Sequence, residues 1–159
     1  MAVERIYSAA SPEAIRAMNR IAAMGRLTVY PDAQAEVLLA SPAIRLLFLQ
    51  APAYSARPVA YLLLQDLPPD AEIFDIAVLP WLRGCGLGAR LLTRGLALLE
   101  RSGCRRCLLE VRESNLTAIR FYQRHGFSRT GRRRGYYAHP SEDALVLERT
   151  FSARAGADF

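Results

Sequence analysis

The alternation of apolar and polar positions divides the chain into short strands and amphipathic helices. Apolar runs bounded by Pro, Gly, Asp or Ser are typical of strands, and apolar residues that recur every three or four positions are typical of helices. Strands are predicted over residues 3–8, 44–50, 59–65, 73–79, 107–111, 127–130 and 144–151, and helices over 14–24, 33–39, 87–101 and 116–125. Because the three strands between 44 and 79 have short connections, we expect an antiparallel meander within an α/β fold.

The predicted helix ends carry their own signals. Ser11 precedes a proline and can cap the first helix, and Ser114 or Asn115 can cap the last one. Gly103 and Gly126 are the expected stops of the two later helices. The last two strands are expected to be joined by a basic, tyrosine-bearing segment, residues 131–137.

A glycine-rich turn follows the strand that ends at residue 79. Gly84, Gly86 and Gly88 stand at alternate positions, which frees the backbone and removes every Cβ that would hold a ligand away. The turn opens a helix whose first amides lack partners and carry partial positive charge, so it is suited to an anion such as a phosphate. Arg83 adds a positive charge at its mouth. A turn that only packs a helix against a strand would show the same glycines.

Length and composition limit the alternatives. A chain of 159 residues suits one domain, expected over 1–159 with a frayed tail after about residue 152. No apolar run approaches the roughly 18 residues of a membrane span, and the N-terminus lacks the pattern of a secretion signal, so we expect a cytoplasmic protein with no membrane partner. The sequence contains no lysine, which excludes a Walker-type nucleotide loop.

The cysteines are expected to be reduced thiols, because three cannot all pair internally. Cys104 and Cys107 have the spacing of a metal or redox pair, but only one further cysteine and two histidines remain as ligands, so no metal site is predicted.

The net charge of +6 is concentrated in the second half, where residues 81–159 hold 15 Arg against 7 acidic residues. Arg132, Arg133 and Arg134 lie beside Tyr136 and Tyr137, a combination that suits phosphate and base contacts. An RNA-binding or ribosome-binding module is therefore an alternative, although a solvated basic turn explains the cluster more simply and nucleic acid is not the expected partner.

Two stretches together resemble the GNAT family of N-acetyltransferases. Residues 83–88 fit the family's R/Q-x-x-G-x-G/A acetyl-coenzyme A loop, and residues 109–127, with Leu-Glu-Val-Arg, Ser-Asn and the helix around Tyr122, are similar to its second half. The segments 76–78, 133–137 and 142–144 most resemble the branch that acetylates the N-terminal alanine of a ribosomal protein. The resemblance covers about residues 70–150, whereas the first 69 residues show no motif that fixes the substrate.

The resemblance implies a mixed, mostly antiparallel sheet flanked by helices and splayed where acetyl-coenzyme A binds. Glu110 would be the general base that deprotonates the incoming amine, and Tyr122 the general acid that protonates the leaving thiolate. Strand alternation alone would also suit an ion-paired Glu110, and a helix cap also explains Asn115. The implied acetyl-coenzyme A contacts are Ile76, Ala77, Val78, Arg83, Gly84, Cys85, Gly86, Leu87, Gly88, Ala89, Asn115 and Tyr122.

The implied reaction is direct acetyl transfer from acetyl-coenzyme A to a protein N-terminal amine, with alanine of a small-subunit ribosomal protein as the expected acceptor. A small-molecule amine or a lysine side chain is the alternative acceptor. Cys85 stands where the family often has a basic residue, which removes one charge near the pyrophosphate, and it is not expected to carry an acetyl intermediate. Whether Arg132 to Arg134 contact cofactor, substrate or solvent is left open, as is the oligomeric state.

Overall fold

The computed structural model describes residues 5–8 and 11–152. The expected start of the first strand at residue 3 and the expected frayed tail after about residue 152 lie outside these residues. In chain order the elements are β1 (Arg5–Ser8), α1 (Pro12–Met24), α2 (Asp32–Leu39), β2 (Ile44–Gln50), β3 (Ala60–Leu67), β4 (Asp70–Val78), the short 3-10 turn η1 (Pro80–Leu82), α3 (Leu87–Arg101), β5 (Arg106–Arg112), α4 (Leu116–Arg124), β6 (Ser128–Ala138) and β7 (Ser141–Thr150).

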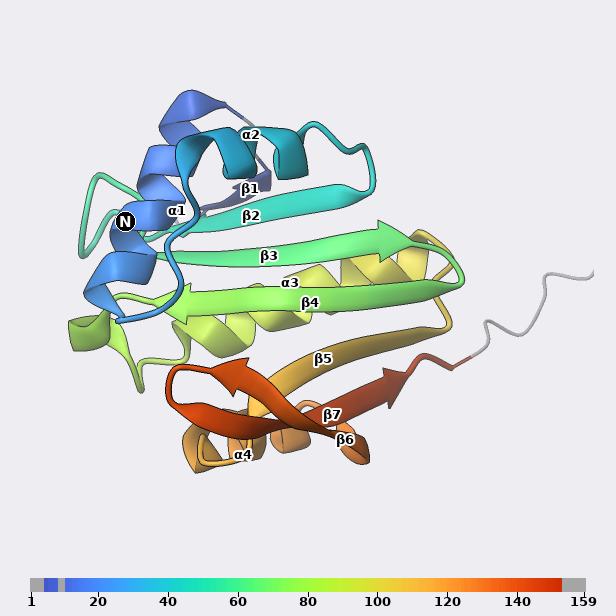
Figure 1. The fold of residues 1–159 in the computed structure, drawn as a ribbon. Coiled ribbons are helices and arrows are strands. Elements are labelled where there is room, and N and C mark those ends of the chain that lie inside the picture. The colour runs from blue at the N-terminus through green and yellow to red at the C-terminus, as the bar shows by residue number, and fades with distance from the viewer. Residues whose placement is uncertain (1–4, 9–10, 153–159) are drawn as a thin grey trace, which may run out of the picture.

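The strands form one sheet in the order β1-β2-β3-β4-β5-β7-β6 (Figure 1). Neighbouring strands are antiparallel throughout the described sheet, except for β4 and β5, which run parallel. The expected mixed, mostly antiparallel sheet and its meander from β2 to β4 are confirmed. Among the helices of the described part of the chain, none combines the length and apolar character that a membrane crossing requires.

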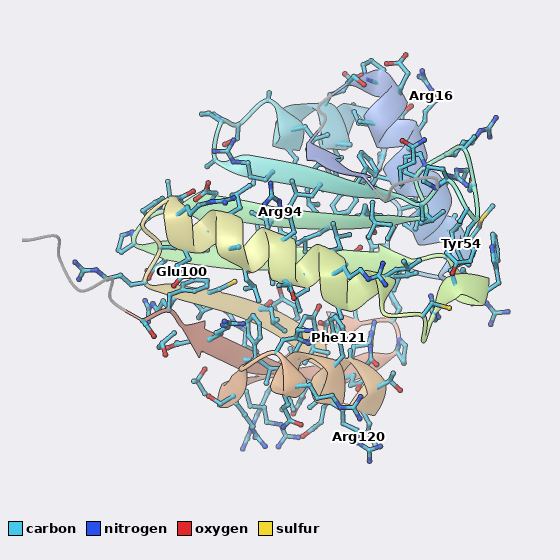
Figure 2. The ribbon with its side chains drawn as sticks, turned by 180° about the vertical axis from the view of Figure 1, so that it is seen from behind. Arg16, Tyr54, Arg94, Glu100, Arg120 and Phe121 are labelled. Atoms are coloured by element: carbon cyan, nitrogen blue, oxygen red, sulfur yellow. The ribbon has the colours of Figure 1, made fainter. Side chains whose placement is uncertain are left out.

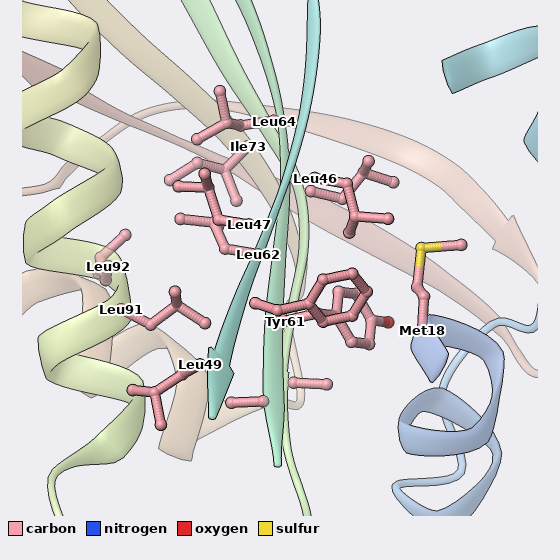
Figure 3. Packing of buried hydrophobic residues seen from close by; sticks show 14 of the residues in the cluster. Met18, Leu46, Leu47, Leu49, Tyr61, Leu62, Leu64, Ile73, Leu91 and Leu92 are labelled. Atoms are coloured by element: carbon pink, nitrogen blue, oxygen red, sulfur yellow. The ribbon is translucent and has the colours of Figure 1, made fainter. Parts of the chain in front are cut away.

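Helices cover both faces of the sheet. Opposite views place α1 and α2 on one face and α3 and α4 on the other (Figures 1 and 2). Side chains alternate along each strand, so the two faces have separate sets of apolar contacts. Met18 of α1 lies on the side to which Tyr61 points, whereas Leu91 of α3 lies on the side of Leu62, and all four residues are fully buried (Figure 3).

The helix α3 is seated closely on the sheet at Gly95. A Cβ atom added to this glycine would come within 2.4 Å of Cδ2 of Leu62 and 3.3 Å of Cδ2 of Leu64. Such distances are shorter than normal carbon contacts, so only a glycine allows this approach. The close packing fixes the middle of α3 against β3.

The helix ends agree with the sequence signals. The Ser11 side chain accepts a hydrogen bond from the Ala14 amide at 3.2 Å, and Asn115 accepts one from the Ala118 amide at 3.1 Å. The helix α3 begins and ends where it was predicted, and Gly103 follows it with a φ of +94°.

The prediction for the basic segment is wrong. Residues 131–137 do not connect two strands but lie inside β6, which extends to Ala138 and pairs with β7 around a tight turn. Because β6 is an edge strand, solvent reaches both of its faces, and charged side chains can line it without the apolar alternation that marks an inner strand.

Candidate active site

The sheet opens between β4 and β5. The two strands pair only from Asp70 and Arg106 to Ile73 and Leu109, after which β5 continues alongside β7 and β4 continues alongside β3. The second half of β4, residues 74–78, therefore turns one row of backbone groups toward the gap rather than toward a neighbouring strand. We call this opening the fork. It is the splay that the resemblance implied, and Ile76, Ala77 and Val78 lie along its edge.

The glycine-rich turn lies directly beyond the end of β4. Gly84 and Gly86 both have a φ of +79°, and an added Cβ at either would meet no atom within 4 Å, so the backbone is left-handed and borders open space. Gly86 is the residue before the first turn of α3, and no side chain caps that helix end. Uncapped amides beside open space are a fit for the phosphates of coenzyme A.

The α4 helix approaches the same turn. A Cβ on Gly88 would lie 3.4 Å from Cγ2 of Val78 and 3.8 Å from the ring of Phe121, so the end of β4, the start of α3 and α4 meet there. The Leu87 side chain is buried in the core, so only the backbone of this residue belongs to the turn. Ala89 is half-buried. These neighbours close the turn on its inner side.

Arg83 and Cys85 are exposed on the outer side of the turn. The Arg83 side chain donates a hydrogen bond from Nε to the Val78 carbonyl oxygen at 3.3 Å and approaches Gly25 at the end of α1. Cys85 lies with Sγ 3.9 Å from the Arg83 carbonyl oxygen. Both residues are at the predicted place, and their contacts with coenzyme A stay predictions.

Tyr122 lies against the fork from the side of α4. Its ring is 7% exposed and packs edge-on against Phe121 and Phe127, with ring centroids 5.3 Å and 5.6 Å apart. Burial, and to a smaller extent the nearby carboxylate of Asp75, raise the pKa of its hydroxyl. A phenol with a raised pKa stays protonated near neutral pH, so it can donate a proton to a departing thiolate. Asn115 caps α4, and nothing further in the structure assigns it to the cofactor.

Glu110 lies on β5 just beyond the start of the fork. Its carboxylate forms an ion pair with Nε of Arg133 at 2.5 Å, and the side chain is 14% exposed. A hydrogen bond to the same carboxylate, together with burial, raises the pKa of Tyr136 to about 12. The sequence left an ion-paired Glu110 open, and the ion pair is present. Its role as base stays a prediction, and that role requires Arg133 to yield its place to the substrate or to a water molecule.

Two arginines of the cluster, Arg132 and Arg133, have partners in the structure. Arg133 contacts Glu110, whereas Arg132 forms ion pairs with Glu113 at 2.6 Å and with Asp143 at 2.8 Å. Sequence reasoning missed both partnerships because they depend on the register of β5, β7 and β6. A pocket of about 150 Å³ lies beside Glu110 and Arg133 and is also lined by Glu72, whose pKa is raised by burial and by the charge of Glu110.

Sequence reasoning also missed Asp75, a carboxylate on the fork edge of β4. It accepts a very short hydrogen bond from the Tyr61 hydroxyl, and burial raises its pKa. The available signal was an acidic residue inside an apolar run that predicts a buried strand, which is unusual enough to mark a functional position.

Comparison with known proteins gives a consistent result. The sequence profile of the acetyltransferase (GNAT) family matches residues 15–127, which confirms the resemblance. The ribosomal protein bS18-alanine N-acetyltransferase of Haemophilus influenzae is 37% identical over 92 residues, covering 56% of this chain and 62% of that protein. The chain thus matches less than two thirds of the length of this curated relative.

The structural likeness extends further than the sequence match. The ribosomal-protein-S18-alanine N-acetyltransferase from Escherichia coli has a TM-score of 0.85 and 26% identity, over 99% of both chains. The NatC complex bound to Gag peptide and CoA has a TM-score of 0.81 at 18% identity, over 94% of this chain and 99% of that one, which shows a shared fold.

Proposed function

Because the chain belongs to the acetyltransferase (GNAT) family, we propose that it acetylates the N-terminal α-amine of a protein, most specifically the alanine of a small-subunit ribosomal protein. Acetyltransferases of this family use acetyl-coenzyme A, which is the co-substrate here. The observation that supports the proposal is the fork, which has Glu110 at its start, the glycine-rich turn beyond the end of β4, and Tyr122 of α4 close enough to feel the charge of Asp75. The likeness to the alanine acetyltransferases of H. influenzae and E. coli supports the choice of acceptor. Such an acceptor places the protein in the cytoplasm.

Acetyl-coenzyme A supplies an acetyl group activated as a thioester. The turn from Gly84 to Gly88 binds its phosphates through backbone amides, and the free amides of β4 beside Ala77 bind its arm and polarise the thioester carbonyl. A single donor of this oxyanion-hole type contributes about 3 kcal/mol to lowering the barrier. These contacts hold the acetyl group in the fork, where an amine arriving from the α1 face can attack it.

Two side chains move protons in this reaction. Glu110 accepts a proton from the ammonium, directly or through water, because an α-amine with a pKa of about 8 releases it readily near neutral pH. Tyr122 donates a proton to the sulfur as the carbon–sulfur bond breaks. Transfer is direct in a ternary complex, since Cys85 lies on the outer side of the glycine-rich turn and away from the fork.

The alternative of an RNA-binding module is weakened by the ion pairs. Arg132 and Arg133 form ion pairs with acidic side chains of this chain, so two of the three clustered arginines are less available to contact RNA phosphates. The alternative of a small-molecule amine or a lysine side chain keeps the same cofactor and catalytic groups.

The acceptor is tested by assaying acetylation of alanyl hexapeptides, the same peptides with a blocked N-terminus and one internal lysine, and free spermidine. We expect turnover of the free N-terminal peptides and little of the other two. Preferred turnover of spermidine or of the blocked lysine peptide would replace the proposed acceptor, and a thermal shift with RNA but not with acetyl-coenzyme A would replace the enzyme itself.

A further inference from the structure

Asp75 lies at the point where the sheet opens. Ile73 is the last β4 residue that pairs with β5, and Asp75 comes two positions later. On the other side of β4, Asp75 pairs with Leu63 of β3. The hydrogen bond from Tyr61 shows that its carboxylate is on the face covered by α1 (Figure 3). This is the face from which the proposed acceptor approaches the fork. Glu110 opens onto the same face from β5, because Glu72 pairs with Leu108, two positions before Glu110, and both glutamates line one pocket.

The Asp75 carboxylate acts on tyrosines from four separate elements, on one through a hydrogen bond and on three through its charge. Tyr61 of β3 donates its hydroxyl hydrogen to Asp75, and the charge of Asp75 contributes to raising the pKa of Tyr30, Tyr122 and Tyr137. These come from the α1–α2 connection, α4 and β6. Segments far apart in the sequence thus converge on one acidic group.

The connection that carries Tyr30 is held in place by a pair of hydrogen bonds. Nδ2 of Asn19 on α1 donates to the Tyr30 carbonyl oxygen at 2.7 Å, and Oδ1 of Asn19 accepts from the Tyr30 amide at 3.0 Å. A residue fixed at both backbone groups presents its side chain with little freedom. The backbone at Tyr30 is therefore fixed relative to α1.

Asp75 has acceptor capacity but no cationic partner within the described residues. Its surroundings are set by burial, the Tyr61 hydroxyl and the Ile76 amide, and no arginine or histidine of the described chain is paired with it. A half-buried carboxylate is stabilised when a cation pairs with it.

We propose that Asp75 binds the ammonium group of the acceptor, with the Tyr61 hydroxyl beside it as its hydrogen-bond donor. This inference rests on the proposed function and divides the work at the fork: Asp75 holds the incoming –NH₃⁺ as an ion pair, and Glu110 takes the proton. Glu110 is less suited to holding the cation, since Arg133 already offsets its charge. The acetylated product carries no positive charge, so it loses this ion pair and leaves.

The test compares two peptides that differ only in the amine. An alanyl hexapeptide and its propionyl analogue, which lacks the amine, are titrated by calorimetry into the enzyme saturated with coenzyme A, so that no turnover occurs. A charge-assisted contact contributes about 1.5–3 kcal/mol, so the wild-type enzyme is expected to bind the alanyl peptide at least about tenfold more tightly. In Asp75→Asn this preference should fall below about threefold, since the amide keeps the shape and the Tyr61 contact but not the charge.

The matched control is Asp66→Asn. Asp66 is a buried carboxylate of the same sheet, whereas Asp75 is half-buried, and Asp66 contacts Arg45, Ser102 and Cys104 at the far end of α3. This variant should keep the tenfold preference. In steady-state acetylation, Asp75→Asn should raise KM for the peptide more than it lowers kcat, with coenzyme A affinity unchanged.

The outcomes separate this inference from the proposed function. If wild-type enzyme acetylates the alanyl peptide and Asp75→Asn keeps the full preference for the amine, Asp75 is not the anchor. A fall in kcat alone, with unchanged peptide binding, would likewise overturn it and assign Asp75 to proton removal. If wild-type enzyme acetylates spermidine and not the peptide, the proposed acceptor fails, and loss of spermidine binding in Asp75→Asn would still support an ammonium anchor, whereas retained binding would reject it.

Discussion

Replacing Gly95 by alanine tests how α3 is held against the sheet. The added Cβ would lie 2.4 Å from Cδ2 of Leu62 and 3.3 Å from Cδ2 of Leu64, and both leucines are fully buried, so neither can swing into solvent. Since carbon atoms normally stay about 3.5–4.0 Å apart, the helix or Leu62 must move by more than 1 Å. The strain is therefore distributed over the central part of the core.

The expected loss of stability follows from two opposing effects. Overpacking of a buried contact costs about 1–3 kcal/mol, and the higher helix propensity of alanine returns up to about 1 kcal/mol. Because two immobile leucines are involved, we expect a net loss of about 1–2 kcal/mol in the free energy of unfolding. For a domain of this size each kcal/mol corresponds to about 2–4 °C in Tm.

Urea unfolding followed by circular dichroism measures this loss, provided the slope of the transition is unchanged. Gly88→Ala is the matched control, because it lies two turns earlier on α3 and its Cβ would meet Val78 only at an ordinary 3.4 Å. That variant should keep its stability and instead weaken coenzyme A binding about tenfold, or about 1.4 kcal/mol, by narrowing the glycine-rich turn. A Gly95→Ala protein as stable as the wild type would refute the close seating of α3.

Three further outcomes are expected. Tyr122→Phe should lower kcat by about 10²-fold or more while leaving stability and coenzyme A affinity nearly unchanged, and unaltered kcat with chemistry limiting would return Tyr122 to a packing role. Glu110→Gln should lower activity by about 10²–10⁴-fold near neutral pH, with the defect shrinking above the amine's pKa of about 8. A defect of constant size between pH 6 and 9.5 would exclude Glu110 as the base. Burial raises the pKa of Asp75 in the folded protein above its ordinary value of 3.8, so the unfolded chain loses this proton at a lower pH than the folded protein does. The free energy of unfolding of the wild type should therefore fall as pH rises from 3.8 to the raised pKa. Asp75→Asn has no such group, so the Tm of the variant minus that of the wild type should increase from acidic to neutral pH. A Tm difference that does not change with pH would contradict the burial of the Asp75 charge.

The fold was predictable where local signals agreed. Residues 87–101 form α3 as predicted, because a glycine-rich turn marks one end, Gly103 the other, and the apolar periodicity between them is regular. The strand β6 was not predictable in this way. Its arginines are exposed on an edge strand, and its pairing with β7 shifts register twice, so neither burial nor alternation marks it.

In the candidate site, too, the features set by local sequence were predictable and those set by strand pairing were not. The turn around Gly86 could be found from the sequence because its chemistry is local and depends on a left-handed backbone. The contact between Glu110 and Arg133 joins residues on strands separated by β7, and so depends on the register of three strands. Asp75 and Tyr61 meet only because β3 and β4 pair as they do, and a lone acidic residue in an apolar run does not reveal its partners.

The opening between β4 and β5 gives this protein two strand edges in its interior. Exposed edges usually invite pairing with other chains and lead to aggregation. Here helices cover the sheet on both faces, and the two strands still pair at one end. A thin, flexible molecule that carries its own amide groups can enter and complete the ladder. The proposed binding of the coenzyme A arm in the fork thus uses strand edges that are a hazard in other sheet proteins.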